Sequence, residues 1–182
     1  MRGLGEGRLA IRTPLQRALR ALALGLMFAL LLTVTPTVTA AGLRSSGPTA
    51  RISRVESSIV HCTNRARNAR GLPSLRRSSV LRHAAKYHAH NMLRYDFFNH
   101  NDPFGQSPAD RVHRFAHRGV FRWVGENIAV GYWNAAGVCR AWMGSQEHRA
   151  NILSRHYTMI GVGYARAADG RTYFVQDFGS HR

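Results

Sequence analysis

Residues 142–163, W-M-G-S-Q-E-H-R-A-N-I-L-S-R-H-Y-T-M-I-G-V-G, carry the strongest fold signal in this chain. They join a segment with a tryptophan and a His-Arg pair to a strand-like run in which apolar residues alternate. Two fragments upstream, F-F-N-H ending at His100 and G-E-N at residues 125–127, add an imidazole and a carboxylate to the imidazole of His148. Two imidazoles and a carboxylate are the ingredients of a metal site or an acid–base site. Because the fragments are far apart in sequence, only a fold can bring them together.

The N-terminal forty residues have the composition of a secretory leader. Five arginines in the first twenty residues precede an apolar run at 21–34, and Val38-Thr39-Ala40 gives the small-residue end that a signal peptidase cuts. The apolar run is shorter than the roughly 20 residues that cross a membrane, which favours cleavage after Ala40 over an uncleaved anchor. We therefore expect a signal peptide at 1–40, a disordered linker at 41–53 and one folded domain at 54–182, in a secreted, extracellular protein with no membrane span in its mature form.

The formal net charge of +17 at pH 7 comes almost entirely from arginine. Charge of this size determines partners rather than fold. It fits a composition bias and affinity for an anionic cell envelope equally well, so envelope polymer or lipid is a candidate partner. Nucleic acid is an unlikely partner, because the sequence has no basic-aromatic motif of the kind that nucleic-acid modules use.

The chain has two cysteines, Cys62 and Cys139. An exported protein meets an oxidising compartment, so a disulfide between them is favoured over two buried free thiols. Closing a loop of this length would stabilise the fold by about 4 to 5 kcal/mol in the chain-entropy model.

Periodicity divides the folded part into several helices and three strands. We expect four helices. The first runs from about Ile52 to Gly71, and the third from a cap at Ser107 to near His117; the second begins at a cap at Ser78 or Ser79 and the fourth at a cap at Asn134. The expected strands are 121–130, 159–165 and 172–178, and Asp169-Gly170 predicts a hairpin between the last two. The pattern is typical of an α+β fold with a small antiparallel sheet.

In this arrangement the domain resembles the bacterial secreted branch of the CAP superfamily, the group of cysteine-rich secretory proteins, antigen 5 and pathogenesis-related plant proteins whose domain is also called SCP-like. The resemblance covers roughly residues 56–179. It is carried by N-x-A-R-x-x-x-G-L-P-x-L-R (64–76), F-F-N-H (97–100), G-E-N-I-A (125–129), Trp142 and H-R-A-N-I-L-x-x-x-Y-T-x-I-G-V-G (148–163). It implies a three-layer α-β-α sandwich with a central antiparallel sheet and a cleft lined by two histidines and two acidic residues.

In some members of that superfamily the cleft binds zinc or another divalent cation. His100, Glu126 and His148 match three of its four residues. The fourth position, acidic in the animal branch, is Ser145 here, as is common in bacterial members. Glu147 lies two residues further on; in a continuous helix its side chain turns roughly 200° away, and it could return to the cleft only if the helix ends before it. Ser145, Glu147 and Asn127 are therefore candidate cleft residues, with Asn127 as a candidate partner of the ligands.

Two interpretations of this set stay open. It could hold zinc or another divalent cation, with water in a fourth position, or it could be a hydrogen-bonded polar network. Tyr132 and Trp133, in a loop with Gly131, are candidates for an exposed apolar rim that receives a ligand. No nucleophile motif such as G-x-S-x-G occurs. We therefore expect a non-enzymatic extracellular binding domain for a small apolar or cell-envelope ligand; the alternative is a metal-dependent hydrolase of peptide or envelope substrates.

Overall fold

The computed structural model describes residues 48–116 and 120–181. The predicted signal peptide and residues 41–47 of the predicted linker lie outside them. The first described helix, α2 (Pro48–Asn68), begins four residues before the expected start, so residues 48–53 are helical although we expected them in the linker. Proline is favoured in the first turn of a helix, because its missing N–H has no intrahelical partner there.

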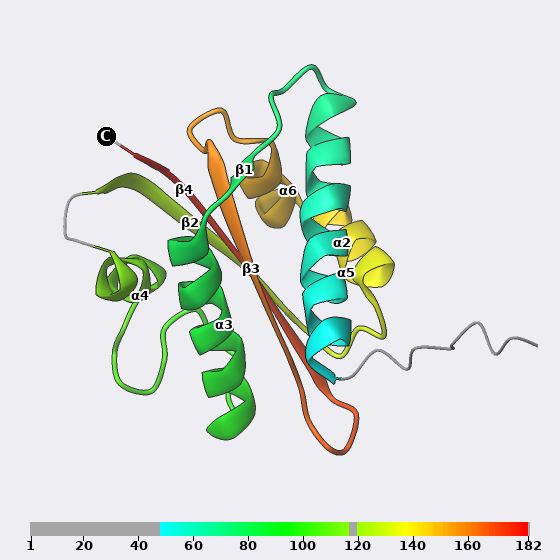
Figure 1. The fold of residues 1–182 in the computed structure, drawn as a ribbon, viewed down its shortest axis with the longest axis vertical. Coiled ribbons are helices and arrows are strands. Elements are labelled where there is room, and N and C mark those ends of the chain that lie inside the picture. Colours follow the sequence, from blue (N-terminus) through cyan, green and yellow to red (C-terminus); the bar gives the residue numbers. More distant parts are fainter. Residues whose placement is uncertain (1–47, 117–119, 182) are drawn as a thin grey trace, which may run out of the picture. The chain divides into compact units, whose positions relative to one another are not determined.

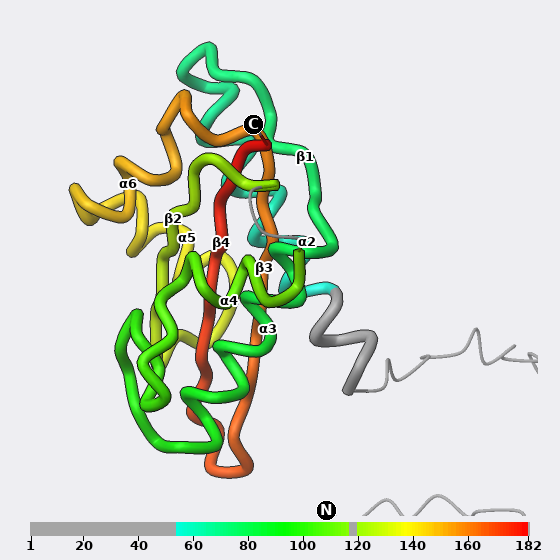
Figure 2. Tube along the Cα trace, turned by 90° about the vertical axis from the view of Figure 1, so that its left-hand side faces the viewer, coloured from blue at the N-terminus to red at the C-terminus, as the bar shows by residue number. Residues whose placement is uncertain are grey.

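A four-stranded sheet forms the middle layer (Figure 1). Figure 2 shows its strands in the order β1 (Arg76–Arg77), β3 (Met159–Arg166), β4 (Thr172–His181) and β2 (Phe121–Val130). The strands β2, β4 and β3 are antiparallel as expected, and β3 and β4 form the predicted hairpin. The short strand β1 pairs parallel to β3 and makes the sheet mixed, which the sequence did not predict. Its two residues are both exposed arginines, so they carry no strand periodicity.

Helices cover the two faces of the sheet. On one face lie α2, α5 (Ala135–Gly144) and α6 (Gln146–Leu153), and on the other α3 (Ser79–Arg94) and α4 (Pro108–Phe115) (Figure 1). The predicted three-layer α-β-α sandwich is therefore confirmed. The predicted caps are confirmed as well: the side chains of Ser78, Ser107 and Asn134 each accept a hydrogen bond from a backbone N–H in the first turn of their helix.

The core on the α2 side is built around Trp142, which is 1% exposed. Its indole Nε1 donates to the carbonyl of Ile128 in the edge strand β2, at 3.2 Å. This tryptophan thus contributes both apolar area and a hydrogen bond that fixes α5 to the sheet. Within the described residues, no helix combines the length and the apolar character needed to cross a membrane.

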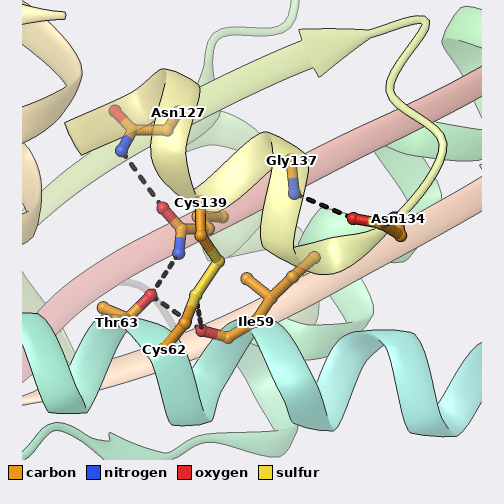
Figure 3. Close-up of a disulfide and its surroundings, with 8 residues drawn as sticks. Ile59, Cys62, Thr63, Asn127, Asn134, Gly137 and Cys139 are labelled. Atoms are coloured by element: carbon orange, nitrogen blue, oxygen red, sulfur yellow. Dashed lines mark hydrogen bonds between the residues drawn. A yellow bond between two sulfur atoms is a disulfide. The ribbon is translucent and has the colours of Figure 1, made fainter. Parts of the chain in front are cut away.

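The predicted disulfide between Cys62 and Cys139 is present and joins α2 to α5 (Figure 3). Beside it, Gln176 of β4 donates to Thr63 Oγ1 at 2.6 Å and accepts from Asn127 of β2 at 3.1 Å. Buried polar groups stabilise a fold when each has a partner. This chain of bonds therefore links α2, β4 and β2 beneath the covalent tie.

Helix α3 approaches β3 more closely than a side chain would allow. A Cβ atom on Gly161 would collide with the backbone of Leu81 and Arg82, and one on Gly163 with the backbone of Ala85. Buried helix backbone has no room to shift without disturbing its packing. The two glycines of the G-V-G motif are therefore required by the close contact between helix and sheet.

We predict that Gly163→Ala destabilises the protein by about 1 to 3 kcal/mol, the usual cost of overpacking a core. Gly144→Ala is the matched control, because nothing lies within 4 Å of the added Cβ and the residue ends α5. Urea unfolding of both variants measures the effect. An equal change in the free energy of unfolding for the two would contradict the packing argument.

Candidate functional site

Glu126 is the centre of a buried polar cluster on the α3 side of the sheet. Its side chain is 1% exposed, and both carboxylate oxygens are occupied. Oε1 accepts a hydrogen bond from Nδ1 of His100 at 2.8 Å, and Oε2 accepts from the guanidinium of Arg111 at 2.6 Å. Burial acts to raise the pKa of Glu126, but the bond from His100 and the charge of Arg111 outweigh it, so the pKa lies below its ordinary value. Glu126 is therefore ionised at neutral pH.

Arg111 reaches Glu126 because α4 is anchored tightly at its start. Ser107 and Asp110 form a capping box, and Pro108 begins the helix. Arg111 follows in the first turn, is fully buried, and also donates to the carbonyl of Gln106 at 2.8 Å. A buried carboxylate needs such a partner, since an unpaired charge in the interior is very costly.

His88 is a further titratable group that contacts this cluster, and it is neutral. His88 of α3 donates from Nε2 to the carbonyl of Asn99 at 2.9 Å, and the same nitrogen lies 3.9 Å from Glu126. Burial lowers the pKa of His88; the charge of Glu126 acts to raise it, but burial and the positive charge of Arg111 together outweigh that effect. Since Glu126 is already paired, a neutral His88 keeps the charges of the cluster balanced.

Asp177 stands opposite Glu126 on the neighbouring strand β4. It is fully buried, and neither of its oxygens accepts a hydrogen bond from a donor in the described residues. Burial and the charge of Glu126 raise the pKa of Asp177 well above its ordinary value. The raised pKa favours the neutral, protonated form of Asp177 beside the ionised Glu126.

His148 completes the predicted set from α6, which runs along the edge strand β2. Asn151 in the same helix donates to the carbonyl of Glu126 and to the side chain of Asn127, at 3.1 and 2.9 Å. Asn127 in turn donates to the carbonyl of His148 at 3.1 Å. Burial lowers the pKa of His148, and the charge of the nearby His100 lowers it further. The H-R-A-N motif thus places one imidazole near the other.

The helix that carries Trp142 ends before Glu147, which is the condition under which the sequence allowed Glu147 to return to the cleft. Helix α5 ends at Gly144, Ser145 is extended, and α6 begins at Gln146. Glu147 is exposed in the first turn of α6, and its charge acts to raise the pKa of His148 against the effect of burial. The side chain of Ser145 makes no capping bond to α6.

The two candidate rim residues have different surroundings. Trp133 is 89% exposed in the loop after β2. Tyr132 packs partly against the core on the α2 side, and its carbonyl accepts from Thr172 at 2.7 Å. A ligand-binding role for this loop stays a prediction.

Sequence reasoning did not identify Arg111 or His88 as members of the site. His88 gave a signal, because it lies on the apolar face of its helix, where a polar side chain needs a partner. The sequence carries no signal for Arg111, because it is one of many arginines in a basic chain.

The described residues contain no group of three or more His, Cys, Asp or Glu side chains placed to hold a metal ion. With both oxygens of Glu126 in bonds, the atoms of the predicted set that have no hydrogen bond within the described residues are Nε2 of His100 and the ring nitrogens of His148, of which Nδ1 is buried. A catalytic zinc ion usually has three protein ligands. Glu126 fits the role of a carboxylate that orients a histidine better than that of a ligand.

The chain matches the model of the Cysteine-rich secretory protein family, CAP, over residues 60–178, and it belongs to this family. It is 36% identical over 117 residues to YkwD of Bacillus subtilis, an alignment that covers 64% of this chain and 44% of YkwD. The chain therefore spans less than half the length of this relative.

Two solved bacterial structures have the same fold. An extracellular protein with an SCP domain from Bacillus anthracis superposes with a TM-score of 0.65 at 27% identity, over 72% of this chain and 42% of that one. An outer surface protein of Borrelia burgdorferi superposes with a TM-score of 0.66 at 22% identity, over 71% of this chain and 94% of that one.

We predict that Asp177→Asn changes how stability depends on pH. The pKa of Asp177 is raised in the folded state. The contribution of its protonated carboxyl to the free energy of unfolding is therefore complete below the unfolded-state pKa of about 4, and it is lost as pH rises through the folded-state pKa. Asparagine cannot ionise, so the variant should lack this loss. Urea unfolding at a series of pH values measures it, with the exposed Asp169→Asn as control. A difference between wild type and Asp177→Asn that is constant with pH would count against a raised pKa.

We also predict that Arg111→Met lowers the free energy of unfolding by about 3 to 5 kcal/mol, because it leaves Glu126 buried without its partner. Adding Glu126→Gln should restore part of the loss, since the uncompensated charge disappears. The control is Arg114→Met on the exposed side of α4, whose loss should stay below about 1 kcal/mol. Equal losses for Arg111→Met and the control would show that the pair is not what stabilises this site.

Proposed function

We propose that this chain is an exported, non-enzymatic binding protein of the cell envelope, with His100, Glu126 and His148 as its ligand site. One observation carries the proposal: a half-exposed imidazole, His100 at 50%, is bonded to a fully enclosed carboxylate. The buried end fixes the ring and its tautomer, and the exposed end offers a preorganised nitrogen. Rigid polar groups of this kind give binding sites their specificity.

Apolar contact surface lies on the same loop as His100. Phe98 and Phe104 are 49% and 60% exposed, and Phe104 packs edge-on against the exposed ring of Tyr95. Exposed aromatic groups beside a polar anchor suit a ligand with an apolar part. They support the small apolar ligand expected from the sequence.

The geometry gives less support to a hydrolase. Both oxygens of Glu126 are already in hydrogen bonds, so it is poorly suited to take a proton from a substrate. Both cysteines are in the disulfide, which removes the thiol nucleophiles. The metal-dependent hydrolase therefore stays the second candidate, favoured by no contact in the site.

A divalent cation, if bound, would be held by the two imidazoles, with Glu126 orienting His100. Its chemistry would be to bridge the protein to an anionic group of a ligand. Export is supported by the disulfide and by the likeness to an extracellular protein of B. anthracis.

We expect His100→Ala/His148→Ala to lose zinc binding and any lipid that co-purifies with the exported chain. Calorimetric zinc titration and mass spectrometry of extracts measure the two. The control is His83→Ala/His90→Ala, two exposed histidines of α3, which should behave as wild type. Wild-type protein with neither stoichiometric zinc nor a co-purifying lipid would refute the proposed site, and zinc-dependent peptide hydrolysis would favour the hydrolase.

A further inference from the structure

A basic track runs along the exposed side of α2, apart from the His–Glu site. It consists of two cavities, of about 520 and 640 Å³. Both are lined by His61, Arg65 and Arg77, so they adjoin one another. The track is therefore elongated and presents two guanidinium groups and an imidazole.

The track is built by specific contacts rather than by loose surface side chains. Asn64 of α2 exchanges two hydrogen bonds with the backbone of Leu75, at 2.8 and 3.0 Å. This pair fastens the segment before β1 to the helix. Arg77, which follows in β1, donates to Ser57 Oγ at 3.2 Å. The guanidinium of Arg77 is thus held over α2, where Arg65 lines the same cavities.

No acidic side chain lines either cavity. The acidic residue of α2, Glu56, is buried and already bonded to Arg82 at 2.8 Å. Gathering cations without a counter-charge costs free energy, which a bound anion would offset. The track therefore has the charge of an anion site.

We propose that this track binds a linear polyol-phosphate polymer of the cell envelope. A guanidinium fork matches the oxygens of a phosphate, and Ser57 and Ser58 add hydroxyl donors at the cavity wall. Two adjoining cavities suit successive phosphates of one chain. The proposal depends on the proposed function only for the envelope setting, because His100, Glu126 and His148 line neither cavity.

The lining distinguishes this polymer from other phosphate-bearing partners. None of the residues that line the two cavities is Phe, Tyr or Trp. Sites for single-stranded nucleic acid usually stack bases on aromatic rings. A membrane surface would need apolar or aromatic side chains that enter the interface, and a recessed track does not present them.

The test measures binding of a fluorescent glycerol-phosphate oligomer to the full chain by anisotropy at low salt. Arg65→Gln/Arg77→Gln should weaken binding about tenfold, as expected for the loss of two exposed ion pairs. The matched control is Arg122→Gln/Arg166→Gln, which removes the same charge from exposed positions on β2 and β3. It should change binding less than about twofold if the contacts are local.

His100→Ala/His148→Ala should leave binding of the oligomer unchanged, which separates this proposal from the ligand site. Absence of binding to wild type, or an equal loss in both arginine variants, would overturn the proposal. Tighter binding to an oligothymidylate of equal charge, or to phosphatidylglycerol vesicles, would overturn the assignment to a polyol-phosphate polymer.

Discussion

The ion pair between Arg111 and Glu126 is the constraint around which the rest of the site is arranged. A carboxylate that is 1% exposed must be neutralised inside the protein, and the 2.6 Å bond from Arg111 does this. The neighbouring groups respond to the same pair. Burial lowers the pKa of His88, burial and the charge of Glu126 raise the pKa of Asp177 against the opposing charge of Arg111, and His100 is fixed by its bond to the same carboxylate. Without the arginine, this face of the sheet would hold two acids and no permanent positive charge beside them.

Three elements meet at the carboxylate of Glu126. Helix α4 brings Arg111, the loop after α3 brings His100, and β2 brings Glu126. On the other side of the edge strand, Asn151 and Asn127 tie α6 to the same part of β2. Polar bonds therefore determine how the helices are placed around β2, while apolar packing determines how they cover the two faces of the sheet. A ligand at His100 would contact a position that three elements hold in common.

Much of the fold could be predicted because its signals are local. The caps at Ser107 and Asn134, the alternation in β3 and β4, and the Asp169-Gly170 turn each lie within a few residues of chain. The break between α5 and α6 gave no such signal, since Gly144 and Ser145 are tolerated within helices. Strand β1 was missed because two exposed arginines pair with β3 through backbone bonds alone. In the site, motifs identified His100, Glu126 and His148, whereas Arg111 could be assigned only once its distance from Glu126 was known.

The pairing of Glu126 with Asp177 has a consequence for the correctness of folding itself. Side chains alternate across a strand, so sliding β2 by one position would turn Glu126 toward the apolar core around Trp142 and move Asn127 to the opposite face. This register shift would bury the charge of Glu126 among apolar side chains and would leave the side chain of Gln176 without its hydrogen bond from Asn127. These buried polar residues therefore oppose a one-residue shift of β2 against β4 and help to fix the register of the sheet.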